Sequence, residues 1–543
     1  MSIAAGTLLR AGAVVLSGAL LTAAFPPFRE SEAAWMALAP LLLVACHSRP
    51  RSAVRWGLAA GGVFWLASLS WLLTLSRTGG PWPLVTLGWI LLAAYCTLYT
   101  GVFAGLVAWI AARTRDWAPA ARQACFLAST PVLWVGLEYL RAILFTGFPW
   151  NALGVSQYRN VAILQLAAWG GVYAVSALLV FVNAALALMA LRVANAFRRR
   201  RQSRISVALA AGLLLWALCT AGGMRAVRRI DAQRDAATEI VVAALEPAVP
   251  QLKKWPPRFA AMIQDRLRRG TELAAGPRTD LVVWPETSVP GAVGGDPRAA
   301  ALIREMAGYG VPVLAGAMEE DTRNGETVLY NSSFLFLPDG SMAGRYRKMH
   351  LVPFGEYLPF EDRVPLIKRF APLGFSCRPG RRMTVFELPV ASAPAPVPFS
   401  VLICFEDTMP YLARRAARAG ARFFVNQTND AWFEGSAGPE QHLSHCVFRC
   451  VENRLPAVRC ANTGVTAFID RAGRIDALRR EDAGEPGFKL DRLLVPPPHL
   501  TATPYRRFGD LLLAVPSAAA LAVLFVLVAV IEKREGSRKR KGS

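Results

Sequence analysis

The chain has 543 residues, of which 54% are hydrophobic and only 18% are charged, and its mean hydropathy is +0.32. These values exclude a single soluble domain and indicate an integral membrane protein. The net charge of +23 would also fit a nucleic-acid-binding protein. Much of the arginine, however, lies in short loops between apolar runs, as is typical of membrane proteins, so no nucleic-acid partner is expected.

Apolar runs predict eight membrane-spanning helices, because backbone groups that have no water partners in lipid must form helices. The runs cover residues 8–25, 33–46, 57–76, 85–111, 125–145, 161–191, 205–222 and 509–531. A helix needs about 20 residues to cross a bilayer, so the run at 33–46 is short. We expect it to pair with the first run as a hairpin. The first run could also be a cleaved signal peptide, but the further spans favour a membrane helix.

The distribution of arginine predicts the orientation of these helices. Loops after the second, fourth and sixth runs are rich in arginine, and the loops between them are poor. Since positive residues mark the cytoplasmic side, both termini are expected in the cytoplasm. The expected domains are a membrane bundle at 1–224, an extracytoplasmic domain at 225–508, an eighth membrane helix at 509–531 and a basic cytoplasmic tail at 532–543.

The fifth apolar run contains two charged residues, Glu138 and Arg141, which are costly in lipid. Their spacing places them on one helical face, where they could form an ion pair near the membrane surface. Alternatively, they could form part of a cavity for a lipid headgroup together with the loop at 147–153. The sequence leaves both interpretations open.

Residues 225–508 alternate short β-rich runs with polar helical stretches, which favours an α/β domain with covered sheet faces. Strands are predicted at 240–245, 281–284, 312–317, 333–337, 384–388, 399–403, 422–425 and 457–461, with 465–469 completing a hairpin. Helices are predicted at 257–269, 297–309, 409–419 and 441–454. Residues 391–398 are proline-rich and predict a flexible connector.

One cysteine, Cys404, directly follows a predicted buried strand and precedes an aromatic residue and two acids. The carboxyl end of a core strand is where α/β folds place reactive groups. A thiol with a pKa of about 8.5 needs a nearby base and cation to act as a nucleophile. Glu286 and Lys348, in two upstream motifs, could supply them. A lone cysteine is more often a buried filler, so the interpretation depends on all three motifs.

Three segments, Trp284-Pro-Glu-Thr, Tyr346-Arg-Lys-Met-His-Leu-Val-Pro-Phe-Gly-Glu-Tyr-Leu-Pro and Leu402-Ile-Cys-Phe-Glu, resemble the Glu-Lys-Cys signature of the nitrilase superfamily. The membrane frame and the segments Asn429-Asp-Ala-Trp-Phe433, Gly438-Pro-Glu-Gln-His442 and Asn462-Thr-Gly-Val-Thr466 resemble the bacterial apolipoprotein N-acyltransferase family over nearly the whole chain. The resemblance implies a multi-pass α-helical membrane protein with an extracytoplasmic α/β nitrilase-like domain, an αββα sandwich. It also implies the bacterial inner membrane, with the catalytic domain facing the periplasm.

The resemblance implies a role for each residue of the signature. Cys404 would be the nucleophile and Glu286 the general base, with a pKa that burial is expected to raise. Lys348 would stabilise the oxyanion, together with the backbone N–H of Phe405. Phe405 replaces a tyrosine found in some members, so any role of a hydroxyl at this position is lost.

Two further acids and several aromatic residues are candidates for supporting roles. Glu356 would orient Lys348 or Glu286, and Glu406 would support either the thiol site or the sheet edge. The aromatic candidates could line an acyl groove or a lid, or could be ordinary core residues. They are Trp255, Tyr357, Phe360, Trp432 and Phe433. Trp255 lies in a loop that resembles a family loop whose tryptophan is needed for function.

The implied substrates are a phospholipid acyl donor and an acceptor lipoprotein whose N-terminal cysteine carries diacylglycerol. Acyl transfer would be ping-pong, through a thioester on Cys404. No cofactor and no metal are expected, although His442, His445, Cys446 and Cys450 are residue types that bind metals. A monomer is expected. The alternatives are a membrane-tethered nitrilase-type amidohydrolase and a non-catalytic lipid-binding or transport protein.

Overall fold

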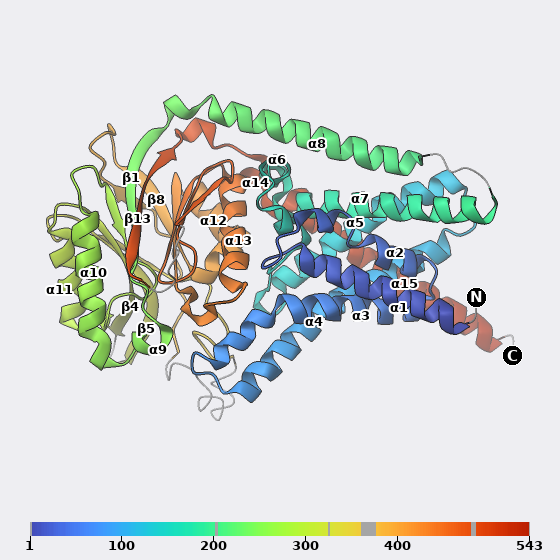
Figure 1. Cartoon of the computed structure of the whole chain (residues 1–543), viewed down its shortest axis with the longest axis horizontal. Helices are drawn as coiled ribbons and strands as arrows, with labels where there is room; N and C mark the ends of the chain where they lie inside the picture. The colour runs from blue at the N-terminus through green and yellow to red at the C-terminus, as the bar shows by residue number, and fades with distance from the viewer. Residues whose placement is uncertain (1–2, 201–204, 324–325, 360–375, 479–484, 542–543) are drawn as a thin grey trace. The chain divides into compact units, whose positions relative to one another are not determined.

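A computed structural model describes residues 3–200, 205–323, 326–359, 376–478 and 485–541 of the chain (Figure 1). The chain forms two compact units. The membrane unit consists of Met1–Ser70, Leu87–Arg225 and Phe508–Ser543, and the sandwich unit of Trp71–Thr86 and Ala226–Arg507. Residues 71–76 were expected to end the third membrane span and residues 85–86 to begin the fourth, but the whole segment Trp71–Thr86 belongs to the sandwich unit.

Long apolar helices make up most of the membrane unit. They are α1 (Ile3–Ala23), α3 (Pro50–Ser68), α4 (Trp82–Arg113), α5 (Pro119–Ile143), α7 (Ala167–Arg198), α8 (Val207–Asp231) and α15 (Ala514–Lys541), with short η3 (Leu144–Thr146), η4 (Leu153–Gln157) and α6 (Val161–Leu164). Among the described residues, six helices are long and apolar enough to cross a membrane. A seventh span arises if α3 and η2 (Ser70–Ser76), bent by 44°, count as one.

The run at 33–46 does not form a spanning helix. It folds as one 3-10 turn, η1 (Ser31–Trp35), followed by the 8-residue α2 (Ala39–Cys46). Asn183 of α7 stabilises the break between them: its Oδ1 accepts hydrogen bonds from the N–H groups of Leu38 (2.7 Å) and Ala39 (3.1 Å), and its Nδ2 donates to the carbonyl of Ala34 (2.9 Å). Because these backbone groups find a protein partner, the interrupted helix is tolerated in the apolar bundle.

Glu138 and Arg141 hold the loop that follows α5. The carboxylate of Glu138 accepts a hydrogen bond from the N–H of Leu153 at 2.6 Å. The guanidinium of Arg141 donates to the carbonyls of Phe148 (2.8 Å) and Trp150 (2.7 Å). Both residues also line a cavity within the membrane unit, together with Leu21, Phe25, Phe64, Trp65, Cys96, Tyr99, Thr100, Trp134, Leu137, Asn151 and Leu153. Both residues thus contact the loop at 147–153 and line a cavity, and a lipid headgroup in that cavity stays a prediction.

Two β-sheets form the centre of the sandwich unit. The first has the order β13-β1-β2-β4-β5-β6, with β3 beside β4, and the second has the order β12-β11-β10-β9-β8-β7. The first contains β1 (Thr238–Glu246), β2 (Leu281–Val283), β3 (Ala292–Val293), β4 (Val313–Arg323), β5 (Glu326–Phe336), β6 (Met342–Arg347) and β13 (Gly487–Val495). The second contains β7 (Phe386–Leu388), β8 (Val397–Ile403), β9 (Phe423–Thr428), β10 (Ala457–Ala461), β11 (Ala467–Ile469) and β12 (Ile475–Ala477).

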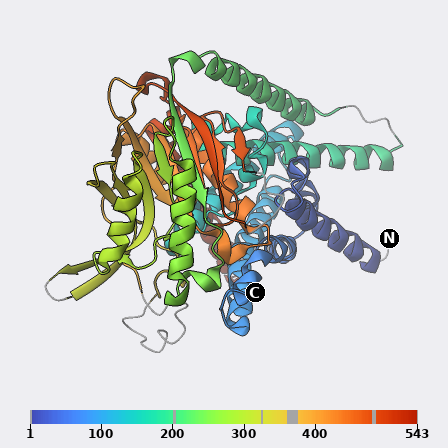
Figure 2. The ribbon, with the colours of Figure 1, turned by 60° about the vertical axis from the view of Figure 1, so that its left-hand side comes forward.

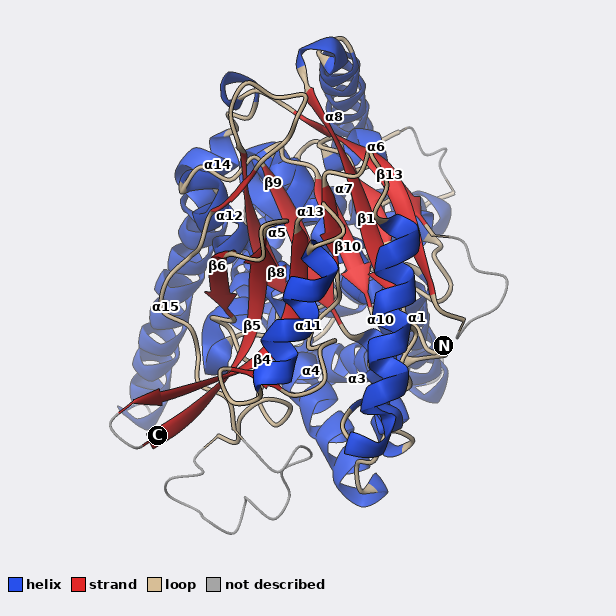
Figure 3. Ribbon diagram, turned by 90° about the vertical axis from the view of Figure 1, so that its left-hand side faces the viewer, coloured by secondary structure: helices blue, strands red, loops and turns tan. Residues whose placement is uncertain are grey.

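The sheets pack face to face, and helices cover both outer faces (Figures 1 and 3). Helices α10 (Ala260–Ala274) and α11 (Pro297–Ala307) pack on the first sheet, and α12 (Pro410–Arg418) and α13 (Gly438–Asn453) on the second. Buried side chains from both sheets, such as Val242, Leu314 and Val425, fill the space between them. The predicted αββα sandwich is therefore confirmed.

Several strands differ from the prediction. Strands β3, β6, β12 and β13 were not predicted, and β13 pairs antiparallel with the whole of β1. β13 is an edge strand that is only partly buried, so it carries charged residues such as Lys489 and Asp491. These residues interrupt the apolar pattern by which strands were predicted. The hairpin of β4 and β5 is longer than predicted and extends beyond the neighbouring strands (Figure 2). Strand β8 already begins at Val397, so the connector expected at 391–398 is shorter.

Phe399 tests how much the packing between the sheets contributes to stability. Its fully buried ring stacks between Phe386 (5.2 Å between centroids) and Phe423 (4.9 Å). Phe399→Ala should lower the free energy of unfolding by about 3–5 kcal/mol through lost burial and a cavity, measured by denaturant unfolding of the sandwich unit within the full chain. Leu490→Ala, at a position 49% exposed on β13, is the control and should change it by less than about 0.5 kcal/mol. Equal effects of the two substitutions would contradict the packing assigned to Phe399.

Candidate active site

The ends of three strands bring together the residues of the Glu-Lys-Cys signature. Strands β2 and β4 are parallel, and two antiparallel pairings return β6 to the same direction. Glu286 follows β2, Lys348 follows β6, and Cys404 follows β8 in the facing sheet. All three side chains therefore come from carboxyl ends of strands, the edge at which α/β folds carry reactive groups.

The buried ammonium of Lys348 links two carboxylates. Its Nζ lies 3.2 Å from Oε1 of Glu286 and 2.8 Å from Oε2 of Glu356. Asn331 of β5 bridges the same two acids, because its Nδ2 donates to Glu286 (2.8 Å) and to Glu356 (2.7 Å). Glu356 also accepts a hydrogen bond from the N–H of Val352 at 2.9 Å. The expectation that Glu356 orients Lys348 fits these contacts.

The charges around Glu286 lower its pKa, contrary to the sequence-based expectation. Burial by itself raises the pKa of this carboxyl, but Lys348 and then Lys254 outweigh burial. The same contacts raise the pKa of Lys348 well above its usual value, since Glu286 and Glu356 outweigh the effect of burial on the ammonium. The side chains of Glu286 and Lys348 are thus both ionised at neutral pH, and the carboxylate is ready to accept a proton.

Cys404 rests as a neutral thiol in a strained turn. Burial, followed by the negative charge of Glu286, raises the pKa of the Cys404 thiol despite the nearby Lys348. Its backbone φ of 51° lies in the left-handed region, which is uncommon for a residue other than glycine. The turn continues as η8 (Cys404–Thr408). Activation of this thiol therefore requires transfer of its proton as it attacks, and Glu286 is the nearby carboxylate.

Glu406 connects the turn after β8 to the segment after β6. Its carboxylate accepts hydrogen bonds from the N–H groups of Ile403 (2.8 Å), Met349 (2.7 Å) and His350 (3.1 Å). The hydroxyl of Tyr346 also donates to it. Burial raises the pKa of Glu406 to about 7. Of the two alternatives for Glu406, these contacts favour support of the thiol site, because they link the backbone beside Cys404 to the backbone that follows Lys348.

Lys254 is a second buried cation that the sequence-based prediction missed. It ends α9 (Gln251–Lys254), and its Nζ donates to the carbonyl of Glu286 at 2.9 Å. Burial lowers the pKa of Lys254 to about 8, although the negative charge of Glu286 opposes the shift. Its neighbour Trp255 had been singled out in the same loop, but nothing in the sequence separates Lys254 from the adjacent Lys253.

Two of the candidate lid residues contact the segment Trp71–Thr86. Trp432 and Phe433 lie in η9 (Asp430–Phe433). The hydroxyl of Thr74 donates to the carbonyl of Trp432 at 3.1 Å, and the ring of Trp71 packs edge-on against Phe433 at 4.6 Å. These aromatic residues are partly buried, so this part of the predicted lid is anchored by a segment distant in sequence.

The other aromatic candidates differ in exposure. Trp255 is 38% exposed. Tyr357 packs against a small apolar cluster that contains Met318, Leu351 and Cys377. The ring of Phe405 lies 5.9 Å from that of His350. Phe360 falls outside the described residues.

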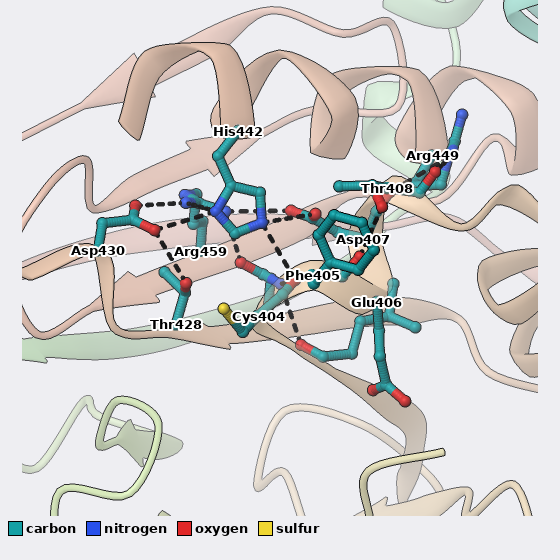
Figure 4. A network of polar contacts seen from close by, with 12 residues as sticks. Cys404, Phe405, Glu406, Asp407, Thr408, Thr428, Asp430, His442, Arg449 and Arg459 are labelled. Carbon is teal, nitrogen blue, oxygen red and sulfur yellow. Dashed lines mark hydrogen bonds and ion pairs between the residues drawn. The ribbon is translucent and has the colours of Figure 1, made fainter. Parts of the chain in front are cut away.

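A second network of buried charges lies beside the Cys404 turn (Figure 4). The ring of His442, from α13, has Nε2 3.0 Å from Oδ1 of Asp407 and Nδ1 3.0 Å from Oδ1 of Asp430. Arg459 of β10 forms ion pairs with Asp407 (3.0 Å) and Asp430 (2.7 Å). Asp430 and His442 lie in segments that carry the family resemblance, but the sequence did not predict their contact, because the members of the network are far apart in the chain.

Comparisons with known proteins support the class of the sandwich unit and the presence of the membrane domain. Residues 241–484 match the family model "Carbon-nitrogen hydrolase", which defines the class of the sandwich unit. Residues 17–185 match "Apolipoprotein N-acyltransferase N-terminal domain". Among solved structures, the chain is similar to Saccharomyces cerevisiae Nit3, a member of branch 10 of the nitrilase superfamily, with 19% identity over 48% of this chain and 90% of that chain and a TM-score of 0.35.

Curated relatives extend the likeness over most of the chain. The apolipoprotein N-acyltransferase of Geobacter metallireducens is 39% identical over 472 residues, which are 85% of this chain and 85% of that protein. The enzyme of the same name from Sinorhizobium fredii is 32% identical over 485 residues, 84% of this chain and 85% of that protein. The chain belongs to the apolipoprotein N-acyltransferase family.

The charge on His442 predicts how stability changes with pH. Burial disfavours the imidazolium, but Asp407 and Asp430 outweigh burial and Arg459 and raise the pKa of His442 from 6.5 to about 9. The folded state then holds a proton that the unfolded state releases. This stabilisation, about 3 kcal/mol, should be complete below pH 6.5 and be lost as the pH rises through about 9.

Melting temperatures measured between pH 7 and pH 8 test this best. Glu406, with a pKa of about 7, changes stability mainly below this range, and Lys254, with a pKa of about 8, changes it mainly above this range. The wild-type melting temperature should fall with rising pH, and His442→Gln should flatten that slope. Parallel pH profiles of the two proteins would show that His442 is not charged in the folded state.

Proposed function

We propose that this chain is an N-acyltransferase that moves an acyl chain from a phospholipid to the α-amino group of the N-terminal S-diacylglyceryl-cysteine of apolipoproteins. The observation that carries the proposal is the arrangement of Glu286, Lys348 and Cys404 at converging strand ends. The names of the relatives support the lipoprotein acceptor. The apolar helices support a donor and an acceptor that remain in the membrane.

The first half-reaction forms a thioester on Cys404. As the sulfur attacks the ester carbonyl of the phospholipid, Glu286 accepts the thiol proton. The ammonium of Lys348 and the N–H of Phe405 stabilise the oxyanion. When the intermediate collapses, the ester C–O bond breaks and Glu286 returns the proton to the leaving oxygen. The products are the acylated enzyme and a lysophospholipid.

The second half-reaction transfers the acyl chain to the lipoprotein. Its α-amine attacks the thioester carbonyl, and the same two groups stabilise the oxyanion. The C–S bond breaks, Glu286 takes a proton from the nitrogen and returns it to the sulfur, and an amide is released. The single thiol serves donor and acceptor in turn, so the kinetics are ping-pong.

The proposed setting is the bacterial inner membrane, with the sandwich unit in the periplasm. Both termini lie in the cytoplasm, which the arginine-rich loops support. The membrane bundle comprises residues 1–224, the catalytic domain 225–508, the last membrane helix 509–531 and the tail 532–543. The enzyme acts as a monomer, without a cofactor or metal.

Removing the nucleophile tests the reaction. Cys404→Ala should abolish acylation, because no other group can carry the thioester, and Glu286→Gln should block thioester formation for want of a base. Mass spectrometry of the protein after incubation with phospholipid should show the acyl adduct in the wild type alone. A diacylglyceryl peptide added next should become an amide, with little free fatty acid. Full turnover by Cys404→Ala would refute the mechanism, and release of fatty acid without amide would indicate a hydrolase.

Lys254 should influence the pH dependence of the same reaction. Lys254→Met removes a cation that lowers the pKa of Glu286, so the acid limb of the acylation rate should move to higher pH. Lys254→Arg retains the charge and should move it less. The adjacent Lys253→Met, at an exposed position, is the matched control. An acid limb that is identical in Lys254→Met and the wild type would exclude an electrostatic role for Lys254.

A further inference from the structure

The carbonyl group of Cys404 accepts two hydrogen bonds from side chains of the second sheet and its covering helix. Nδ2 of Asn426, on β9, lies 3.2 Å from this oxygen, and Nε2 of His442, on α13, also lies 3.2 Å from it. Asp430 holds the ring of His442 at its other nitrogen, while Nε2 also lies 3.0 Å from Oδ1 of Asp407 in the turn. Figure 4 shows the ring beside the Cys404 backbone, between the aspartates.

These two hydrogen bonds also affect the N–H of Phe405, which belongs to the same peptide group as the carbonyl of Cys404. The bond between Cys404 and Phe405 is trans and planar, so its N–H points away from its C=O. Fixing the carbonyl oxygen of Cys404 therefore also fixes the direction of the Phe405 N–H. This N–H is the backbone donor assigned to the oxyanion in the proposed reaction.

Helix α13 holds the rest of the turn in a similar way. Nη1 of Arg449, two helical turns after His442, lies 3.4 Å from the carbonyl of Asp407 and 3.3 Å from that of Thr408. Two cationic side chains of one helix thus face the carbonyls of η8. A cation at a peptide carbonyl also polarises the peptide group and strengthens its N–H as a donor.

We infer that His442 is a positioning residue for acyl transfer: by holding the carbonyl of Cys404, it orients the Phe405 N–H that stabilises the oxyanion. The inference rests on the proposed thioester chemistry and adds a residue that touches neither substrate. His442 acts on both half-reactions, because each passes through an oxyanion. It does not act on the thiol proton, which Glu286 accepts.

The charged groups that face His442 determine which variants can test this role. They are Asp407 of η8, Asp430 of η9 and Arg459 of β10, and with His442 protonated the four charges cancel. His442→Leu removes the donor but leaves one carboxylate without a partner, which could destabilise the fold. The double variant His442→Leu with Asp407→Asn removes the donor and restores neutrality.

The experiment compares two reactions of Cys404 in the full-length, detergent-purified protein. The first is single-turnover acylation by a labelled phospholipid and, separately, by a p-nitrophenyl acyl ester; both reactions develop an oxyanion. The second is alkylation by iodoacetamide, a displacement at carbon that develops none. His442→Leu and the double variant should acylate about 10–100-fold more slowly than the wild type, with alkylation within about threefold. Deacylation by a diacylglyceryl peptide should slow by a similar factor.

Two further variants serve as controls. His442→Gln retains an amide N–H that can reach the carbonyl and should recover part of the lost acylation rate. His445→Leu makes the same substitution at another buried position of α13 and should acylate at the wild-type rate.

Each outcome decides the inference. Slow acylation with normal alkylation in the charge-balanced double variant supports it. Equal loss of acylation and alkylation would show that His442 acts on the thiol or on the fold. Recovery of both stability and acylation in the double variant would show that His442 is only a counter-ion. Either result overturns the inference. A wild-type protein that reacts with the nitrophenyl ester but not with phospholipid refutes the proposed donor alone. A wild-type protein that reacts with neither ester overturns both proposals.

Discussion

The balance of buried charges around one strained turn is the constraint on which the candidate active site depends. Burying an ion costs several kcal/mol unless a partner compensates it. On one side of Cys404, Lys348 and Lys254 compensate Glu286 and Glu356. On the other side, His442 and Arg459 compensate Asp407 and Asp430. Burial and the charge of Glu286 raise the pKa of the Cys404 thiol and keep it protonated at rest, whereas Lys348 and Lys254 lower the pKa of Glu286 and keep its carboxylate ionised.

The packing of the two sheets positions these charged groups relative to Cys404. Glu286 and Lys348 belong to the first sheet, whereas Cys404 belongs to the second. Glu406 bridges them, since it follows Cys404 and accepts hydrogen bonds from backbone groups that follow Lys348. A carboxylate held in this way limits sliding between the sheets at the point where the reacting groups meet. The apolar layer between the sheets therefore fixes the distances between these groups, although it contains none of their side chains.

Much of the fold could be predicted from the sequence, because long apolar runs and short alternating runs have few alternative structures. The prediction of helices and strands failed where polar side chains or distant contacts outweighed the local hydrophobic pattern. The run at 33–46 is apolar enough for membrane, but Asn183 satisfies the backbone of an interrupted helix there. Strand β13 was not predicted because its charged residues interrupt the apolar pattern, although it pairs with the whole of β1. The segment from Trp71 to Thr86 belongs to the sandwich unit because Trp71 packs on Phe433, a contact that no local pattern encodes.

For the site, the sequence by itself predicted Glu286, Lys348 and Cys404 as the candidate residues, since each lies in a short motif after a strand. It could not determine their protonation, because a pKa depends on charges brought close only by folding. Burial alone suggested a raised pKa for Glu286, and the tertiary structure reversed the direction by adding Lys254 to Lys348. The structure alone also brought His442 to the carbonyl of Cys404, across 38 residues of chain. Local sequence sets the type of residue at each strand end, whereas packing sets its partners and therefore its charge.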